Sequence, residues 1–155
     1  MLRLSRKLMF AIEAVVDIAY NAADTPVQSK DIATRQNIPR RYLEQVLQQF
    51  VREGVLSGVR GPRGGYRLAR ERRRVTLGQI TRIVAAMEDT SDPVESSTGS
   101  MLGREVLRPI WHELQNDALA KLDQISIEDL CGRARNSGIE GACKQIEVDF
   151  AIRTS

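Results

Sequence analysis

The alternation of apolar and polar residues predicts amphipathic helices in the first third of the chain. A first helix is predicted over residues 5–22, with Leu8, Ile12, Val15, Val16, Ala19 and Tyr20 on its inner face. Ser29 is a favourable N-cap for a short second helix over residues 30–36. A third helix is predicted over residues 39–53, because proline suits a first turn and Gly54 suits a C-terminal stop.

Two short extended segments follow the third helix. Residues 55–60 and 65–69 are separated by the turn sequence Gly61-Pro62-Arg63-Gly64, which predicts a β-hairpin. The order helix, helix, turn, helix, hairpin is that of a winged helix-turn-helix. The fold class is therefore predicted to be mainly α, with the third helix as the reading helix and the hairpin as the wing.

The second half of the chain reads as helices separated by one acidic segment. Thr76 and Gln79 fit a capping box for a fourth helix ending near residue 87, and residues 88–103 read as an acidic, Ser/Thr-rich loop. Helices are expected within 104–135, and residues 136–155 form a tail. The long helix carries an apolar stripe at near-heptad spacing: Leu107, Ile110, Leu114, Ala118 and Leu122. The stripe either faces the core of its own chain or, as we favour, pairs with its twin as a dimerisation helix.

Charge is distributed unevenly along the 155 residues. Residues 1–82 carry 16 Lys/Arg against 7 Asp/Glu, whereas residues 83–155 carry 7 against 13. Fourteen of the 16 cations in the first part are arginine, which suits phosphate and guanine recognition. This composition favours a nucleic-acid partner. The chain has no apolar run of the roughly 20 residues that a membrane span needs, and Glu13 and Asp17 interrupt the apolar part of its N-terminus, so we expect a cytoplasmic protein.

The hairpin sequence predicts contact with double-stranded DNA. Glycines allow its backbone to approach a groove closely, and Pro62 limits the entropy lost on binding. Arg60 and Arg63 would extend from the narrow tip, as suits the negative potential of a minor groove. The loop lacks the Lys-Ser/Thr end of a phosphate-binding P-loop and does not open a helix, which argues against a nucleotide site.

The start of the third helix supplies the other candidate contacts, because the N-terminal residues of a reading helix reach base edges. The candidates are Arg40, Arg41, Tyr42, Glu44 and Gln45. Glu44 would either accept a hydrogen bond from cytosine or orient an arginine. Tyr42 would be either a contact or part of the core.

Several of these segments together resemble the IscR-type family of winged-helix transcription regulators. They are Tyr42-Leu43-Glu44-Gln45, Gly54-Val55-Leu56, the wing from Val59 to Leu68, and Ala14-Val15-Val16-Asp17-Ile18-Ala19. The resemblance covers roughly residues 1–130. It implies a homodimer on palindromic operator DNA, with Glu44 and Arg60 in base-contacting positions and Arg41 and Tyr42 beside them.

Many members of that family hold an iron–sulfur cluster through three cysteines in the loop before the long helix. Residues 88–108 contain no cysteine and no histidine, so the chain is expected to lack a cluster, and we assign it no cofactor and no metal. It is more similar to members without these cysteines, including repressors of cysteine metabolism. The resemblance therefore implies a repressor responding to a small-molecule or protein effector that is not identified.

Two cysteines, Cys131 and Cys143, leave a further alternative open. They are either a buried apolar residue and an incidental thiol, or a redox pair or intersubunit metal site with His112. The remaining alternative is a winged-helix adaptor that binds an acidic protein partner. An enzyme is not expected, because no nucleophile–base pair or catalytic carboxylate pair is visible in the sequence.

Overall fold

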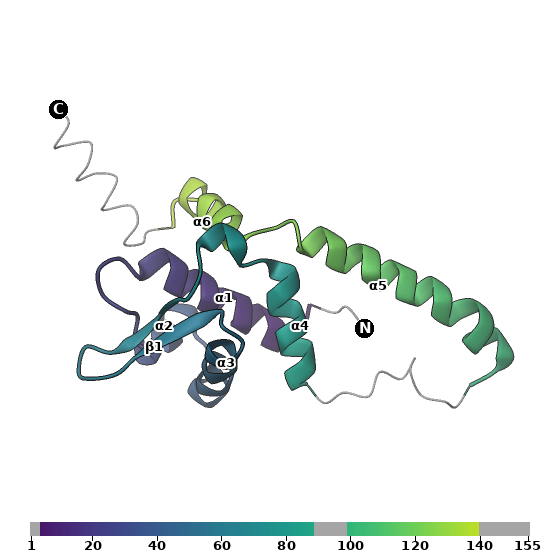
Figure 1. The fold of residues 1–155 in the computed structure, drawn as a ribbon, viewed down its shortest axis with the longest axis horizontal. Coiled ribbons are helices and arrows are strands. Elements are labelled where there is room, and N and C mark those ends of the chain that lie inside the picture. Colours follow the sequence, from purple (N-terminus) through teal and green to yellow (C-terminus); the bar gives the residue numbers. More distant parts are fainter. Residues whose placement is uncertain (1–3, 89–98, 140–155) are drawn as a thin grey trace.

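A computed structural model describes residues 4–88 and 99–139 and confirms the winged-helix order (Figure 1). The elements in chain order are α1 (Arg6–Asn21), α2 (Ser29–Gln36), α3 (Arg40–Arg52), β1 (Leu56–Val59), β2 (Gly65–Leu68), the 3-10 turn η1 (Arg72–Arg74), α4 (Leu77–Met87), the π-helical turn η2 (Gly103–Leu107), α5 (Arg108–Leu122) and α6 (Ile127–Asn136). The two strands form an antiparallel hairpin in which Leu56 pairs with Leu68 and Val59 with Gly65.

Helix α1 is the centre of the core and contacts α2, α3, α4, α6 and β2. Its fully buried positions include Ala11, Ala14 and Ile18, whereas Ile12 and Val16 are only partly buried. The predicted inner positions Leu8, Val15, Ala19 and Tyr20 are confirmed as buried, but the buried surface also extends to positions that the prediction left out. Because α1 is surrounded by several elements, small alanines allow close approach on sides that a one-sided amphipathic pattern leaves to solvent.

The reading helix α3 has the buried stripe that its sequence predicts: Leu43, Val46, Leu47 and Phe50 are each 0% exposed. Gly54 ends this helix with a φ of 73°. The amide of Val55 donates to the carbonyl of Phe50 at 2.9 Å, and that of Gly54 to Val51 at 3.2 Å. This is a Schellman motif, which needs a residue in the left-handed region and leads the chain directly into the wing.

A buried carboxylate ties α1 to α2. Asp17 is 2% exposed, and its two carboxylate oxygens accept hydrogen bonds from Arg35 at 2.9 and 2.7 Å. The side chain of Gln36 donates a third bond at 2.8 Å. The bond to Asp17 is the main cause that raises the pKa of Arg35. A carboxylate satisfied in this way fixes the position of α2 relative to the core.

Side-chain caps define the starts of α4 and α6, and the two caps lie side by side. The Thr76 side chain accepts from the amide of Gln79, and Ser126 forms a reciprocal capping box with Asp129. Thr76 and Ser126 also pair as an isolated antiparallel bridge. The N-cap of α2 differs from the prediction, because the helix begins at Ser29 itself and its N-cap makes no side-chain hydrogen bond.

The long C-terminal helix extends away from the body (Figure 1) and begins slightly earlier than predicted, at residue 101. Pro109 lies in the first turn of α5, just after the π-helical turn η2. Proline has no amide hydrogen to donate to the preceding turn, and the wider spacing of the π-helical turn tolerates that missing hydrogen bond. No residue of α5 is buried in the single chain, and its main contact with the body is α4. Within the described residues, no helix has the length and apolar character needed to cross a membrane.

Replacing Arg35 with Met should destabilise the protein by roughly 3 kcal/mol, because it leaves the Asp17 carboxylate buried with too few donors. Urea unfolding of the variant measures this change. The control is Arg52→Met, which removes an exposed arginine from the last turn of α3. Equal stability of the two variants would contradict the role assigned to Asp17.

Candidate nucleic-acid interface

The solvent face of α3 carries the predicted base-reading residues. Arg40, Arg41, Glu44 and Gln45 are all exposed, because the opposite face of the helix is buried. Arg40 and Glu44 form an ion pair, with 3.3 Å between Nε and Oε1. Their side chains are 68% and 52% exposed, so the pair adds little to stability. The pair is the arrangement expected if Glu44 orients Arg40, and the role of Glu44 as a cytosine reader stays a prediction.

The shape of the wing depends on two glycines whose Cα atoms lie close to the backbone of neighbouring segments. A methyl group on Gly64 would overlap the carbonyl oxygen of Val59, and one on Gly65 would overlap that of Val27. The turn is closed by the Gly64 amide, which donates to the carbonyl of Gly61 at 2.9 Å. Only glycine fits these positions without displacing the backbone.

The wing is attached to the segment that precedes α2. Val27 and Tyr66 exchange two backbone hydrogen bonds of 3.0 and 2.8 Å, as in an antiparallel sheet. The side chain of Gln28 lies 3.5 Å from the carbonyl of Pro62 at the wing tip. These contacts place the hairpin beside the helix-turn-helix rather than free in solution.

A basic groove lies between the wing and the starts of α2 and α3. Its volume is about 640 Å³, and its lining includes Lys30 from α2, Arg40 from α3 and Arg60 from the wing. Arg63 is exposed at the same wing tip. Arg60 and Arg63 make no ion pair with any residue that the structure describes. Cations from three separate elements therefore converge on one surface that is free to bind a polyanion.

The side chain of Tyr42, unlike those of the other candidates on α3, packs against α1. Its hydroxyl donates to the carbonyl of Lys7 at 2.7 Å, and its ring packs against Phe10 with centroids 6.1 Å apart. Burial, and then the charge of Glu88, raise the pKa of Tyr42 to about 12. The side chain joins α3 to the start of α1, so the alternative of a packing residue describes it better than that of a base contact.

Sequence reasoning did not select Gln28 or Lys30 as part of this surface. Both lie where the chain enters α2. Their position at the N-terminal end of a helix in a helix-turn-helix is the feature of the sequence that could have indicated a place in the groove. Their contribution depends on the pairing of Val27 with Tyr66, which joins segments 39 positions apart in sequence. No local pattern predicts such a contact.

The thiol and metal alternatives find little support in the described residues. Cys131 is 0% exposed within the core, and Cys143 lies outside those residues. His112 is exposed on α5, and the described residues contain no group of three or more His, Cys, Asp or Glu able to hold a metal ion. With no thiol in the sequence of residues 88–108, this chain does not fit an iron–sulfur cluster at that segment.

A reading helix and a wing that border one basic groove define the winged helix-turn-helix class of DNA-binding proteins. The chain belongs to the Rrf2 family, whose model, described as an iron-dependent transcriptional regulator, matches residues 4–133.

Named relatives and solved structures agree with that family. The chain is 30% identical to the HTH-type transcriptional regulator IscR of Photobacterium profundum, over 99% of this chain and 90% of that protein. It is 32% identical to IscR of Xenorhabdus nematophila, over 83% of this chain and 79% of that protein. The structure of IscR from T. potens matches with a TM-score of 0.69 at 29% identity, over 88% of this chain and 90% of that one. The structure of CymR, the global cysteine regulator of B. subtilis, matches with a TM-score of 0.67 at 28% identity, over 86% and 98%.

These matches confirm the resemblance found in the sequence. The chain is a DNA-binding transcription regulator, and the relatives it matches are regulators rather than enzymes.

Gly64→Ala should distort the wing, because the added methyl group meets the backbone carbonyl of Val59. We expect a loss of roughly 1–3 kcal/mol in stability, as for other strained backbone positions, measured by thermal unfolding. Gly58→Ala is the matched control, since a methyl group there meets nothing within 4 Å. Identical melting temperatures for the two variants would contradict the close packing of the wing turn.

Proposed function

We propose that the protein is a homodimeric repressor that reads a palindromic operator with α3 and the wing, without an iron–sulfur cluster. The observation that carries the proposal is the basic groove, in which Lys30, Arg40 and Arg60 converge from three elements. In this arrangement α3 lies in the major groove, and Arg60 and Arg63 reach the adjacent minor groove. Bound across a promoter, the dimer represses by covering the DNA.

The exposed face of α5 supports the dimer. Leu107, Ile110 and Leu114 are 57%, 52% and 54% exposed in the single chain. Ala118 and Leu122 continue the stripe and are half-buried at the end of α5 that meets α4. Met101, Leu102, Val106 and Trp111 add further exposed apolar surface to the same helical stretch. A long apolar stripe that its own chain leaves exposed suits pairing with a second copy.

Two subunits give the operator its expected form. A two-fold dimer binds two half-sites on one face of the duplex, about one helical turn (~34 Å) apart or a multiple of it. The similarity to CymR supports a link to sulfur or cysteine metabolism, since that neighbour is named as the global cysteine regulator of B. subtilis. The signal would be a small molecule or a partner protein rather than a cluster.

Selection of bound duplexes from a random pool tests this function. A palindromic consensus would support the dimeric reader, and recovery of random sequences would contradict it. Within the selected operator, Arg60→Ala should weaken binding by about 1–3 kcal/mol, roughly 5- to 150-fold, and relax one base preference. Arg104→Ala is the control, because it removes one exposed cation from η2, away from the groove. Equal affinities of the two variants would contradict the role of Arg60.

Ile110→Glu should convert the dimer to a monomer, because it places a charge in the middle of the apolar stripe. Sedimentation equilibrium measures the change in mass. His112→Glu introduces the same charge at an exposed position off the stripe and should leave the dimer intact. A wild-type protein that sediments as a monomer, or an Ile110→Glu variant that remains a dimer, would contradict pairing through α5.

A further inference from the structure

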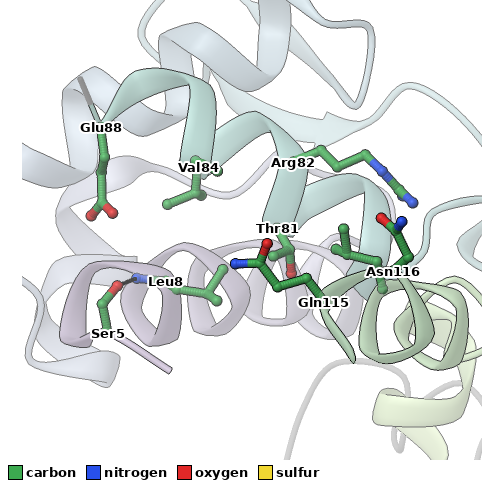
Figure 2. Close-up of a pocket in the computed structure, with 10 residues that line it drawn as sticks. Ser5, Leu8, Thr81, Arg82, Val84, Glu88, Gln115 and Asn116 are labelled. Atoms are coloured by element: carbon green, nitrogen blue, oxygen red, sulfur yellow. Dashed lines mark hydrogen bonds between the residues drawn. The ribbon is translucent and has the colours of Figure 1, made fainter. Parts of the chain in front are cut away.

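Two hollows of the described surface differ in what surrounds them. Figure 2 shows the smaller, of about 210 Å³, between the first turn of α1, α4 and the C-terminal half of α5. Gln115 in its wall is seven positions from Leu122, which places both on nearly the same face of α5, so this cavity adjoins the proposed dimer stripe. The basic groove beside the wing lies clear of that stripe, because none of its lining residues belongs to α5.

The basic groove also has an apolar side. Val51 of α3 and Val59 of β1 both line it, and they are 37% and 42% exposed. Within residues 4–88, the other exposed large hydrophobic residues are Leu4 and Met9, so half of this set lies in one groove. Valine is not among the residues that helices favour, so helix propensity does not explain Val51 at an exposed position near the end of α3. A contact with the occupant of the groove would explain it.

The proposed binding mode identifies which part of the duplex crosses this groove. A single sugar–phosphate backbone separates a major groove from the adjacent minor groove. With α3 in the major groove and Arg60 in the minor groove, that backbone passes between the helix and the wing. The groove volume of about 640 Å³ equals roughly 20 water molecules at ~30 Å³ each, which suits a short length of one strand.

The two kinds of lining match the two repeating parts of that strand. Lys30 and Arg60 present cations, which attract phosphate groups. Val51 and Val59 present methyl groups, which form no hydrogen bonds and suit the C–H surface of a sugar. Deoxyribose carries a CH₂ group at its 2′ carbon where ribose carries a hydroxyl. A ribose pressed against the valines would leave that hydroxyl without a partner, which weakens binding.

We therefore infer that Val51 and Val59 are specificity-determining residues that select deoxyribose over ribose in the strand between α3 and the wing. The cations of the groove bind the phosphates of either nucleic acid, whereas the valines favour a sugar without the 2′ hydroxyl. This inference rests on the proposed function, because it requires α3 and the wing to lie in neighbouring grooves of one duplex.

Single ribonucleotides in the selected operator test the sugar contact. One deoxyribonucleotide at a time is replaced by its ribonucleotide along both strands, with 5-methyluridine for thymidine so that the base is unchanged. Fluorescence anisotropy at fixed salt gives each dissociation constant. We expect a loss of roughly fivefold to tenfold at one or two neighbouring positions in each half-site, and less than about twofold elsewhere. A scan in which no position loses more than about twofold overturns the inference.

Threonine variants assign the effect to the valines. Replacing both Val51 and Val59 with Thr keeps the branched shape and adds hydroxyls that can hydrogen-bond to a ribose, so the loss at the sensitive positions should fall to about twofold or less. Val106→Thr is the matched control, because Val106 is 46% exposed on η2 and outside the groove, and it should retain the wild-type loss. Each loss is a ratio for one variant, so a general change in affinity cancels. A wild-type pattern in the double variant contradicts the assignment.

The 5-methyl group of thymine is the other apolar group that the valines could meet. Deoxyuridine in place of each thymidine removes that methyl group and keeps the deoxyribose, so it should not reproduce the valine-dependent loss. If deoxyuridine weakens binding, the double variant removes that loss and ribose costs nothing, the valines contact bases and the inference is wrong. Binding of the unmodified operator without a ribose effect overturns only the sugar contact. A wild-type protein that binds no duplex overturns the proposed function as well.

Discussion

The pairing of Val27 with Tyr66 is the constraint on which the proposed DNA-binding surface depends. Two backbone hydrogen bonds join the wing to the segment that leads into α2, and they form because Gly65 presents no side chain to the carbonyl of Val27. Without this attachment the two arginines of the wing tip would move independently of α3. With it, cations from three elements border one groove, so the entropy of arranging them is lost on folding rather than on binding DNA.

A few specific contacts in the core hold α2 and the wing in position. Asp17 holds α2 by accepting bonds from Arg35 and Gln36, and the Schellman motif at Gly54 directs the chain from α3 into the wing. The α5 helix is different, because its single chain buries none of its residues. Its apolar stripe is exposed in the single chain and is the surface that the proposed dimer would bury.

Local patterns predicted the elements well, because each depends on neighbouring residues. The α3 stripe, the cap at Thr76 and the glycine stop at residue 54 follow from spacing and backbone preference alone. The additional burial of Ala11, Ala14 and Ile18 in α1 and the direction of the Tyr42 side chain did not follow, because both depend on which elements surround them in space. Lys30 borders the groove because of the long-range pairing of Val27 with Tyr66, which no local pattern predicts.

A crystal structure of the protein on its selected duplex tests the central claim most directly. The account predicts α3 in a major groove, the Arg60 and Arg63 side chains in the adjacent minor groove, and phosphate oxygens within hydrogen-bond distance of Lys30. A complex in which the wing tip contacts the second subunit, or turns away from the DNA, would contradict it.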